Sequence, residues 1–209
     1  LKYTGERMIM EQRTDEWYNI RLGKVTASCL DNVMASKSSA AYQNYLSKLV
    51  AERLTGVMDE MPINQAMQRG IDLEDEAKFV YFLKTGNEVV DTGFVQHPCI
   101  DNTGASPDGL IGDDGLIEIK CPNTSTHIKT LKTGKPSLTY LRQMQWQMRC
   151  TDRQWCDFVS YDNRLPSPMD LFIKRINRDE SLIEEIETAV ISFLNEVDET
   201  VKYLQSIEA

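Results

Sequence analysis

The chain has 209 residues, of which 41% are hydrophobic and 26% charged, a composition typical of a globular protein large enough to bury a core. It contains no apolar run long enough to cross a bilayer and no recognisable signal segment, so we expect a cytoplasmic protein without a membrane partner. Five cysteines, an odd number without a C-x-x-C pair, argue against a disulfide framework and predict reduced thiols.

The net charge of −9 is unevenly distributed along the chain. Residues 178–209 carry a net charge of −7, whereas residues 1–177 carry only −2. Basic residues also cluster locally, as in "HIKTLKTGK" at 127–135. The overall charge therefore neither supports nor excludes a nucleic-acid partner.

The N-terminal part of the sequence predicts helices. A short helix is expected from Thr14 or Asp15 through Leu22. Ser28, with Asp31 three residues later, resembles a capping arrangement for a second helix.

Two longer helices are expected next. Residues 35–41 predict a mobile loop, and the apolar spacing of residues 42–54 predicts a helix that stops at Gly56. A further helix is expected over residues 64–84, with Gly86 after it.

The second half of the chain predicts a sheet. "EVVDTGFVQHP" is rich in strand-forming residues, a hairpin is expected around residues 109–121, and two more strands over 154–162 and 169–176. Helices are expected over residues 138–150 and from about 179 to 207. This order predicts one α/β or α+β domain with a central mixed sheet, spanning residues 1–209.

The predicted hairpin carries an unusual set of charges. "GDDG" at 112–115 is a strong turn signal, and in the strand that follows it Glu118 and Lys120 share one face. The turn folds Asp108 back beside Glu118. An even loop would place Asp108 opposite Ile119, so an odd loop or a bulge is needed to align the two acids.

Two converging carboxylates repel each other unless a cation lies between them, and oxygen ligands suit Mg²⁺ or Mn²⁺. Lys120 beside such a site can orient the attacking water and stabilise charge on a phosphate, as metal-assisted phosphodiester hydrolysis requires. Glu and Lys two residues apart are also common on a solvated strand with a weak ion pair. The upstream Pro-Asp-Gly and the turn spacing leave these two interpretations balanced.

Pro-Asp followed ten residues later by Glu-x-Lys is the pattern of the PD-(D/E)xK nuclease superfamily. Five blocks, "WYNIRLGKVTAS", "GIDLEDEA", "ASPDGL", "LIEIKCP" and "YLRQMQWQM", occur in the order found in one family of it. Through these blocks the chain resembles the lambda exonuclease-like family of viral recombination alkaline exonucleases, from about Gln12 to Asp162. The resemblance implies a restriction-endonuclease-like central mixed β-sheet flanked by helices, with a long C-terminal helix.

The resemblance also implies the residues of a metal-dependent active site. Lys120 would be the catalytic lysine, and Gln143 would position the catalytic groups, with Gln145 and Gln147 as rivals. The metal ligands would be two hairpin acids, a helix-borne acid and one carbonyl: Asp108, Glu118, Glu74 and Ile119. The assignment of Glu74 rests on the resemblance, because its acidic neighbours Asp72, Asp75 and Glu76 are equally compatible with a solvated helix.

A second group of residues would bind DNA. The resemblance implies that Arg21 and Ser28 hold a terminal 5′-phosphate and that Ser106 adds a hydroxyl, which fits the phosphate chemistry of Arg. Lys37 in the loop "ASKSSAAYQ" would contact phosphate. Met61 and Pro62 lie where a duplex wedge is expected. Basic residues of a channel or its rim would be Lys48, Lys129, Lys132 or Lys135.

The implied activity is Mg²⁺-dependent 5′→3′ exonuclease digestion of one strand of linear duplex DNA from a 5′-phosphorylated end. Two ions, for which Mn²⁺ can substitute, would serve each active site, and mononucleotides would be released. A homotrimeric ring around DNA and a single-strand annealing protein as partner would follow, in the cytoplasm of a bacterial host and with a phage or prophage origin.

Three alternatives remain open. A PD-(D/E)xK endonuclease or junction resolvase would cut closed circular DNA, which an exonuclease would not. A catalytically inactive DNA-binding module has no reason to keep Asp108, Glu118 and Lys120 together. A plain interaction protein that binds through its acidic C-terminal helix leaves the five ordered blocks unexplained.

Overall fold

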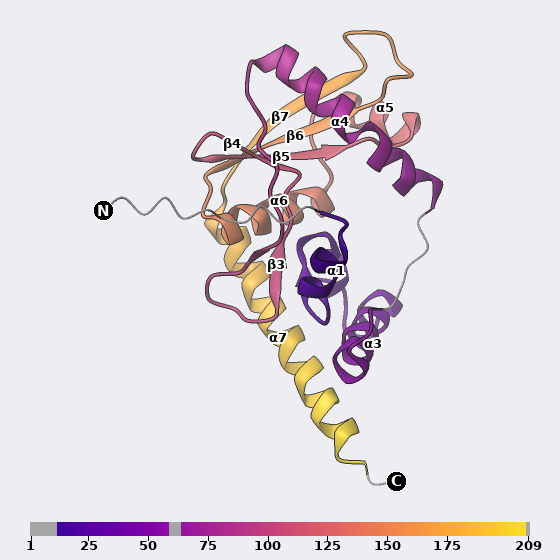
Figure 1. The fold of residues 1–209 in the computed structure, drawn as a ribbon, viewed down its shortest axis with the longest axis vertical. Coiled ribbons are helices and arrows are strands. Elements are labelled where there is room, and N and C mark those ends of the chain that lie inside the picture. The colour runs from indigo at the N-terminus through magenta and orange to yellow at the C-terminus, as the bar shows by residue number, and fades with distance from the viewer. Residues whose placement is uncertain (1–11, 59–63, 208–209) are drawn as a thin grey trace, which may run out of the picture.

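The computed structural model describes residues 12–58 and 64–207 of the chain (Figure 1). Thr14, Ser39, Asn64 and Ser137 each accept a backbone N–H at the start of a helix, as N-cap side chains do. In chain order the helices are α1 (Asp15–Arg21), α2 (Leu30–Val33), α3 (Ala40–Thr55), α4 (Gln65–Thr85), α5 (Thr124–Thr133), α6 (Leu138–Thr151) and α7 (Glu180–Gln205).

The strands form two sheets. A three-stranded sheet has the order β1-β3-β2, with β1 (Val25–Thr26) parallel and β2 (Val95–Gln96) antiparallel to β3 (Thr103–Ala105). A four-stranded mixed sheet has the order β4-β5-β6-β7, and its inner strands β5 and β6 are parallel. Its strands are β4 (Gly109–Ile111), β5 (Gly115–Lys120), β6 (Trp155–Tyr161) and β7 (Leu171–Asn177).

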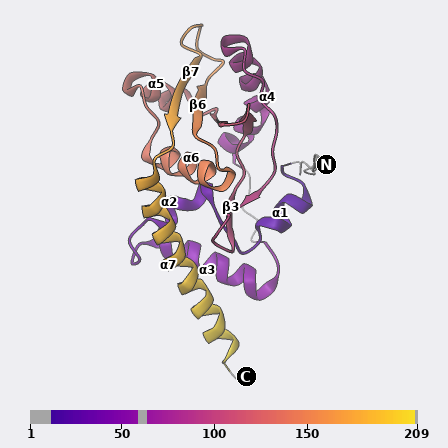
Figure 2. The same ribbon diagram turned by 90° about the vertical axis from the view of Figure 1, so that its left-hand side faces the viewer.

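Helices α4 and α6 cover opposite faces of the four-stranded sheet (Figure 2). Ile117 and Ile119 of β5 pack with Leu73 and Tyr81 of α4. The alternate residue Leu116 packs with α6, because successive side chains of a strand point to opposite faces. The side chain of Glu118 therefore lies on the α6 face of the sheet.

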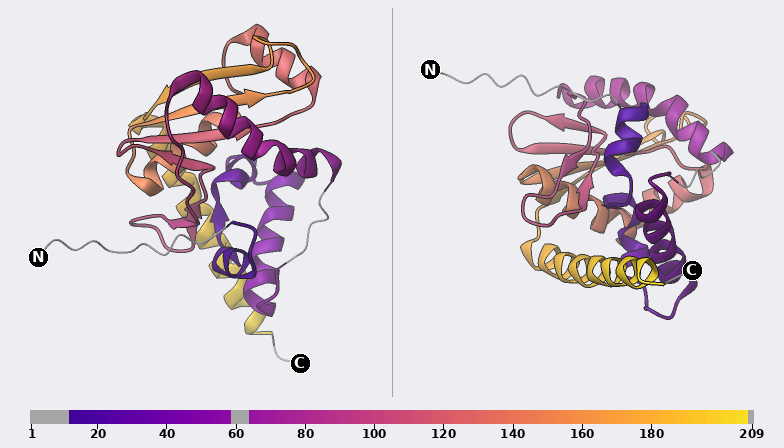
Figure 3. Two further views of the ribbon diagram at one scale, coloured as in Figure 1. Left: turned by 45° about the horizontal axis from the view of Figure 1, so that its top comes forward. Right: turned by 60° about the horizontal axis from the view of Figure 1, so that its bottom comes forward.

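Helix α6 also belongs to a second core below the sheet. Trp146 and Cys150 of α6 are buried together with residues of β1, α2, α3, β3 and α7, among them Tyr45 and Phe193. Their rings stack with centroids 5.4 Å apart. Figure 3 shows α7 extending away from the four-stranded sheet. Helix α7 packs against α3, and its buried stripe includes Ile186 and Val190, as its amphipathic pattern predicted.

The α/β architecture confirms the predicted fold class and the long C-terminal helix, which begins and ends within two residues of its predicted bounds. Gly56 and Gly86 adopt the left-handed conformation at the ends of α3 and α4, as expected for helix-terminating glycines. The proposed cap at Ser28 is wrong. Ser28 lies inside a 3₁₀ turn, η1 (Ala27–Cys29), and makes no capping hydrogen bond, while Asp31 turns to Arg142 of α6.

The predicted single sheet is divided at Pro107. The chain leaves β3 at Ala105 and enters β4 at Gly109, and Pro107 between them has no N–H to continue a ladder. The stretch "EVVDTGFVQHP" forms only β2 and an isolated bridge from Val90 to Leu110. No helix of the described ranges 12–58 and 64–207 is long and apolar enough to span a membrane, and all five cysteines are free, as predicted.

Candidate active site

The hairpin brings Asp108 and Glu118 together. Residues 112–114 form a three-residue loop, and Gly109 pairs with Ile117. One step further along this register, Asp108 lies opposite Glu118, so the odd loop predicted from the sequence is the observed solution. Asp108 also accepts a hydrogen bond from the backbone N–H of Ile119, at 2.7 Å from its Oδ2.

Glu118 is fully buried and has three donors around it. Lys120 of the same strand forms an ion pair with Oε1. Two amides from α6 complete the set: Gln143 Nε2 lies 2.7 Å from Oε1, and Gln147 Nε2 lies 2.6 Å from Oε2. Gln145 faces elsewhere, bonding the backbone of Asn177 and Asp179. Of the three candidate glutamines, Gln143 and Gln147 thus reach Glu118.

The charges of this site perturb one another. Burial raises the pKa of Asp108 well above its ordinary value of 3.8, and the neighbouring carboxylates of Glu118 and Glu74 raise it further. Burial alone would lower the pKa of Lys120, but Glu118 and Asp108 raise it above its ordinary value. Lys120 is therefore held as a cation by the acids beside it, with Glu118 in direct contact.

The oxygen atoms at this edge fit a divalent cation. The N–H of Ile119 points toward Asp108, and in a strand the C=O of a residue points to the same side as its N–H. Continuing the register places Pro107 opposite Ile119, and Pro107 has no N–H to donate to that carbonyl. Two carboxylates and a carbonyl match the oxygen preference of Mg²⁺.

Glu74 comes from a different element than these two acids, but its charge is near enough to raise the pKa of Asp108. It lies on α4, which covers the other face of the sheet, and pairs with Arg13 and with Lys78, 3.2 Å from its Oε1. Across residues 12–58 and 64–207, no three His, Cys, Asp or Glu side chains form a group able to hold a metal. Glu76 accepts a hydrogen bond from Tyr161, whereas Glu74 is the acid of α4 whose charge raises the pKa of Asp108.

The residues predicted to hold a phosphate gather at the edge of the smaller sheet. Parallel strands place their carboxyl ends at the same edge, and Thr26 of β1 pairs with Gly104 of β3. Ser28 comes two residues after Thr26, and Ser106 comes two residues after Gly104. Ser28 is exposed, and its Oγ lies 3.4 Å from that of Thr26.

Trp17 links Arg21 to this edge. The Arg21 guanidinium lies 3.7 Å from the centroid of the Trp17 ring, whose Nε1 donates to Ser106 Oγ at 3.0 Å. Burial lowers the pKa of Arg21, and its Nε has no hydrogen-bond partner among the residues described. A positive group that is short of acceptors is suited to an anion. Sequence reasoning missed Trp17.

The other residues predicted to contact DNA come from other parts of the chain than this phosphate edge. Lys37 pairs with Glu196 of α7, 2.8 Å away, and Lys48 pairs with Glu52. The other predicted channel lysines, Lys129, Lys132 and Lys135, are exposed on and after α5. Met61 and Pro62, the predicted wedge, lie outside the described residues.

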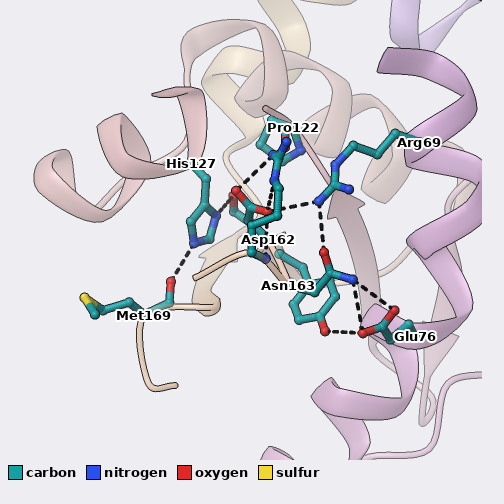
Figure 4. A network of polar contacts seen from close by, with 10 residues as sticks. Arg69, Glu76, Pro122, His127, Asp162, Asn163 and Met169 are labelled. Atoms are coloured by element: carbon teal, nitrogen blue, oxygen red, sulfur yellow. Dashed lines mark hydrogen bonds and ion pairs between the residues drawn. The ribbon is translucent and has the colours of Figure 1, made fainter. Parts of the chain in front are cut away.

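Another buried carboxylate, Asp162, also missed from the sequence, lies at the end of β6 (Figure 4). Asp162 is fully buried and accepts hydrogen bonds from Arg164 at 2.7 Å and from Arg69 of α4 at 3.0 Å. Arg164 also donates to the carbonyl of Pro122, two residues after Lys120. This network ties α4 to the ends of β5 and β6. The sequence "YDNR" at 161–164, with an acid two residues before an arginine, was the signal that could have pointed to this ion pair.

A paired carboxylate and lysine at the edge of a mixed sheet match the pattern that the sequence predicted for a nuclease. The model of the YqaJ-like viral recombinase domain matches residues 16–154, and the chain belongs to this family. The alkaline exonuclease LHK-Exo from Laribacter hongkongensis is 56% identical, with a TM-score of 0.87 over 92% of this chain and 96% of that one.

A structure of LHK-Exo in complex with dAMP matches with 55% identity and a TM-score of 0.88, over 92% of this chain and 96% of that one. A phage-related exonuclease from Haemophilus somnus 129PT shares the fold, with 19% identity and a TM-score of 0.68 over 87% of this chain and 96% of that one. No curated protein sequence matches. The resemblance to lambda exonuclease-like enzymes is thus confirmed, and the chain is a member of a metal-dependent nuclease family.

Proposed function

We propose that this protein is a Mg²⁺-dependent 5′→3′ exonuclease that digests one strand of linear duplex DNA from a 5′-phosphorylated end. It would release mononucleotides and leave a 3′ single strand for recombination by strand annealing. The observation that carries the proposal is the convergence of Asp108, Glu118 and Lys120 on one edge of β5. Family membership and the similarity to LHK-Exo, which has been observed with dAMP, support it.

In this proposal Asp108, Glu118 and the carbonyl of Ile119 hold the metal, with Glu74 as a further ligand. Two bound divalent ions would supply Lewis-acid stabilisation of the charge on the phosphate. Lys120 orients the attacking water through its ammonium group, and its proximity to both acids keeps it charged. Gln143 holds the carboxylate of Glu118 in a fixed direction.

The spacing of the two sites supports end-specific cleavage. Ser106 at the phosphate edge and Asp108 at the carboxylate edge are two residues apart, about 7 Å along an extended chain. The side chain of Gln12 donates to the carbonyl of Pro107 between them, at 2.8 Å, which holds this connection. A phosphate bound by Arg21, Ser28 and Ser106 would therefore place a neighbouring phosphodiester near the metal ligands.

We also propose a homotrimeric ring around DNA and a single-strand annealing protein as partner. In a ring the acidic outer side of α7 would face away from the duplex, because like charges repel. Light scattering at several protein concentrations tests the ring, with three times the mass of one chain as the expected result. A stable monomer would contradict it.

The decisive experiment uses end-labelled linear duplex with and without a 5′-phosphate, and covalently closed circles. We expect Mg²⁺-dependent loss of linear DNA only, faster with the phosphate, and absent in Lys120→Ala. Lys84→Ala, which removes an exposed lysine at the end of α4, is the matched control and keeps activity. Cleavage of circles would indicate an endonuclease or junction resolvase. Activity that survives EDTA would contradict the metal, and no cleavage at all would indicate an inactive DNA-binding module.

A further inference from the structure

We infer that Gln147 is a positioning residue that anchors the buried side of the Glu118 carboxylate. The inference rests on the function proposed above, because it concerns the same metal ligand. Gln143 and Gln147 are four residues apart and lie on the same face of α6. Each amide holds a different oxygen of Glu118, with Gln143 on Oε1 and Gln147 on Oε2. A carboxylate held at both oxygens can no longer rotate freely.

The two oxygens have different surroundings. Oε1 is shared by Lys120 and Gln143, which are both partly exposed, whereas Oε2 is bonded by Gln147, which is fully buried. An ionised carboxylate that is removed from water needs donors on its buried side. Gln147 supplies a neutral donor there, so Oε2 is held without a second cation that would oppose a metal.

The orientation of the Gln147 amide shows what determines it. A carboxylate only accepts hydrogen bonds, so Gln147 must turn its N–H₂ group toward Glu118. Its Oε1 is then buried without a hydrogen-bond partner among the described residues, which carries a cost in free energy. The bond to Glu118 therefore sets the direction of this side chain.

Gln145 provides a contrast on the same helix. Its Nε2 donates to the carbonyl of Asn177 at 2.9 Å, and its Oε1 accepts the N–H of Asp179 at 2.9 Å. Both ends of the Gln145 amide are satisfied, and they join α6 to the start of α7. A glutamine that serves the fold alone is satisfied in this way, whereas Gln147 is not.

The test is Mn²⁺ binding to the DNA-free protein, measured by calorimetry for wild type, Gln147→Met and Gln145→Met. Met has the length of Gln and a similar helix propensity but no amide. Partners that orient a metal ligand typically contribute about 10- to 100-fold in affinity. We expect Gln147→Met to weaken Mn²⁺ binding by about that factor, and Gln145→Met to change it less than twofold while lowering the melting temperature.

Circular dichroism establishes whether each variant folds, and Gln147→Leu replaces Gln147→Met if the latter does not. Folded Gln147 variants that bind Mn²⁺ within twofold of wild type would overturn the inference. Equal weakening by Gln145→Met would also overturn it, because the effect would then belong to α6 as a whole. If wild type cleaves DNA and binds Mn²⁺, these results leave the proposed function standing. A wild type that neither binds Mn²⁺ nor cleaves would overturn both.

Discussion

The two sheets meet at residues 106–108 and carry opposite chemistry at their adjoining edges. The four-stranded sheet presents Asp108 and Glu118, whose charges repel a phosphate unless cations are bound. The smaller sheet lies beside Arg21 and two serines, which attract a phosphate without any metal. In the proposed function, recognition of a DNA end would then be separable from cleavage, with binding independent of metal and chemistry dependent on it.

The largest expected effect is that of removing one acid, which should slow cleavage without weakening metal-free DNA binding. Asp108→Asn keeps the acceptor for the N–H of Ile119 but removes a charge. Since metal stabilisation contributes several kcal/mol, we expect single-turnover cleavage in Mg²⁺ to slow by about 10²- to 10³-fold. Metal-free binding of 5′-phosphorylated duplex should stay equal or become tighter, because repulsion is reduced. Weaker metal-free binding would contradict the separation of DNA-end binding from cleavage.

The complementary change is Arg21→Gln at the smaller sheet. Hydrogen bonds to charged groups contribute about 1.5–3 kcal/mol, so the preference for a 5′-phosphate over a 5′-hydroxyl should fall about 10- to 100-fold. Competition between the two labelled duplexes measures this ratio. Mn²⁺ affinity of the DNA-free protein should not change, and a change would mean that the two edges are coupled.

Asp162 sharpens the comparison within the four-stranded sheet, because its pKa shifts opposite to that of Asp108. Burial alone would raise the pKa of Asp162, but hydrogen bonds from Arg164 and Thr124 lower it below the ordinary 3.8. A lowered folded-state pKa contributes stability that is present above the unfolded pKa and is lost as the pH falls. Asp162 is therefore an anion that stabilises the fold, whereas Asp108 is a ligand of the proposed metal site.

We expect Asp162→Asn to lower the free energy of unfolding by about 1–3 kcal/mol at pH 7. The difference from wild type should shrink below about pH 3.8, where the unfolded state takes up the proton. Urea unfolding over a series of pH values measures both quantities. A difference that stays constant with pH would show that the charge of Asp162 is not the cause.

The smallest expected effect concerns Trp17. Trp17→Phe keeps an aromatic ring beneath Arg21 but removes the N–H donated to Ser106. One neutral hydrogen bond contributes about 0.5–1.5 kcal/mol, so the 5′-phosphate preference should fall about two- to tenfold. The same competition assay detects it. No change in preference would place Ser106 outside the phosphate site.

Much of the candidate site could be predicted because it is local in sequence. Strand alternation put Glu118 and Lys120 on one face, and the turn at 112–115 brought Asp108 back to them. The choice among three glutamines could not be made from sequence order alone. Helical spacing pairs Gln143 with Gln147, a signal that could have been used, but only the packing of α6 on β5 shows that both reach Glu118.

The sequence was misleading or undecided where a residue has partners far away along the chain. Asp31, three residues after Ser28, suggested a cap, yet Asp31 pairs with Arg142, 111 residues later. Glu74 and Glu76 are indistinguishable on an acidic helix, and their partners come from other elements, Arg13 and Tyr161. Trp17 and Asp162 gained their contacts in the same way, from Ser106 and Arg69.

Short-range periodicity and turn chemistry in the sequence determined the hairpin and most of the helices, because backbone geometry ties these features to neighbouring residues, although α5 (Thr124–Thr133) was not predicted. Tertiary structure alone decided the burial of Glu118 between two amides and the joining of Arg21 to Ser106 through Trp17. These arrangements depend on which faces pack together, and packing brings together residues whose distance in sequence carries no periodic signal.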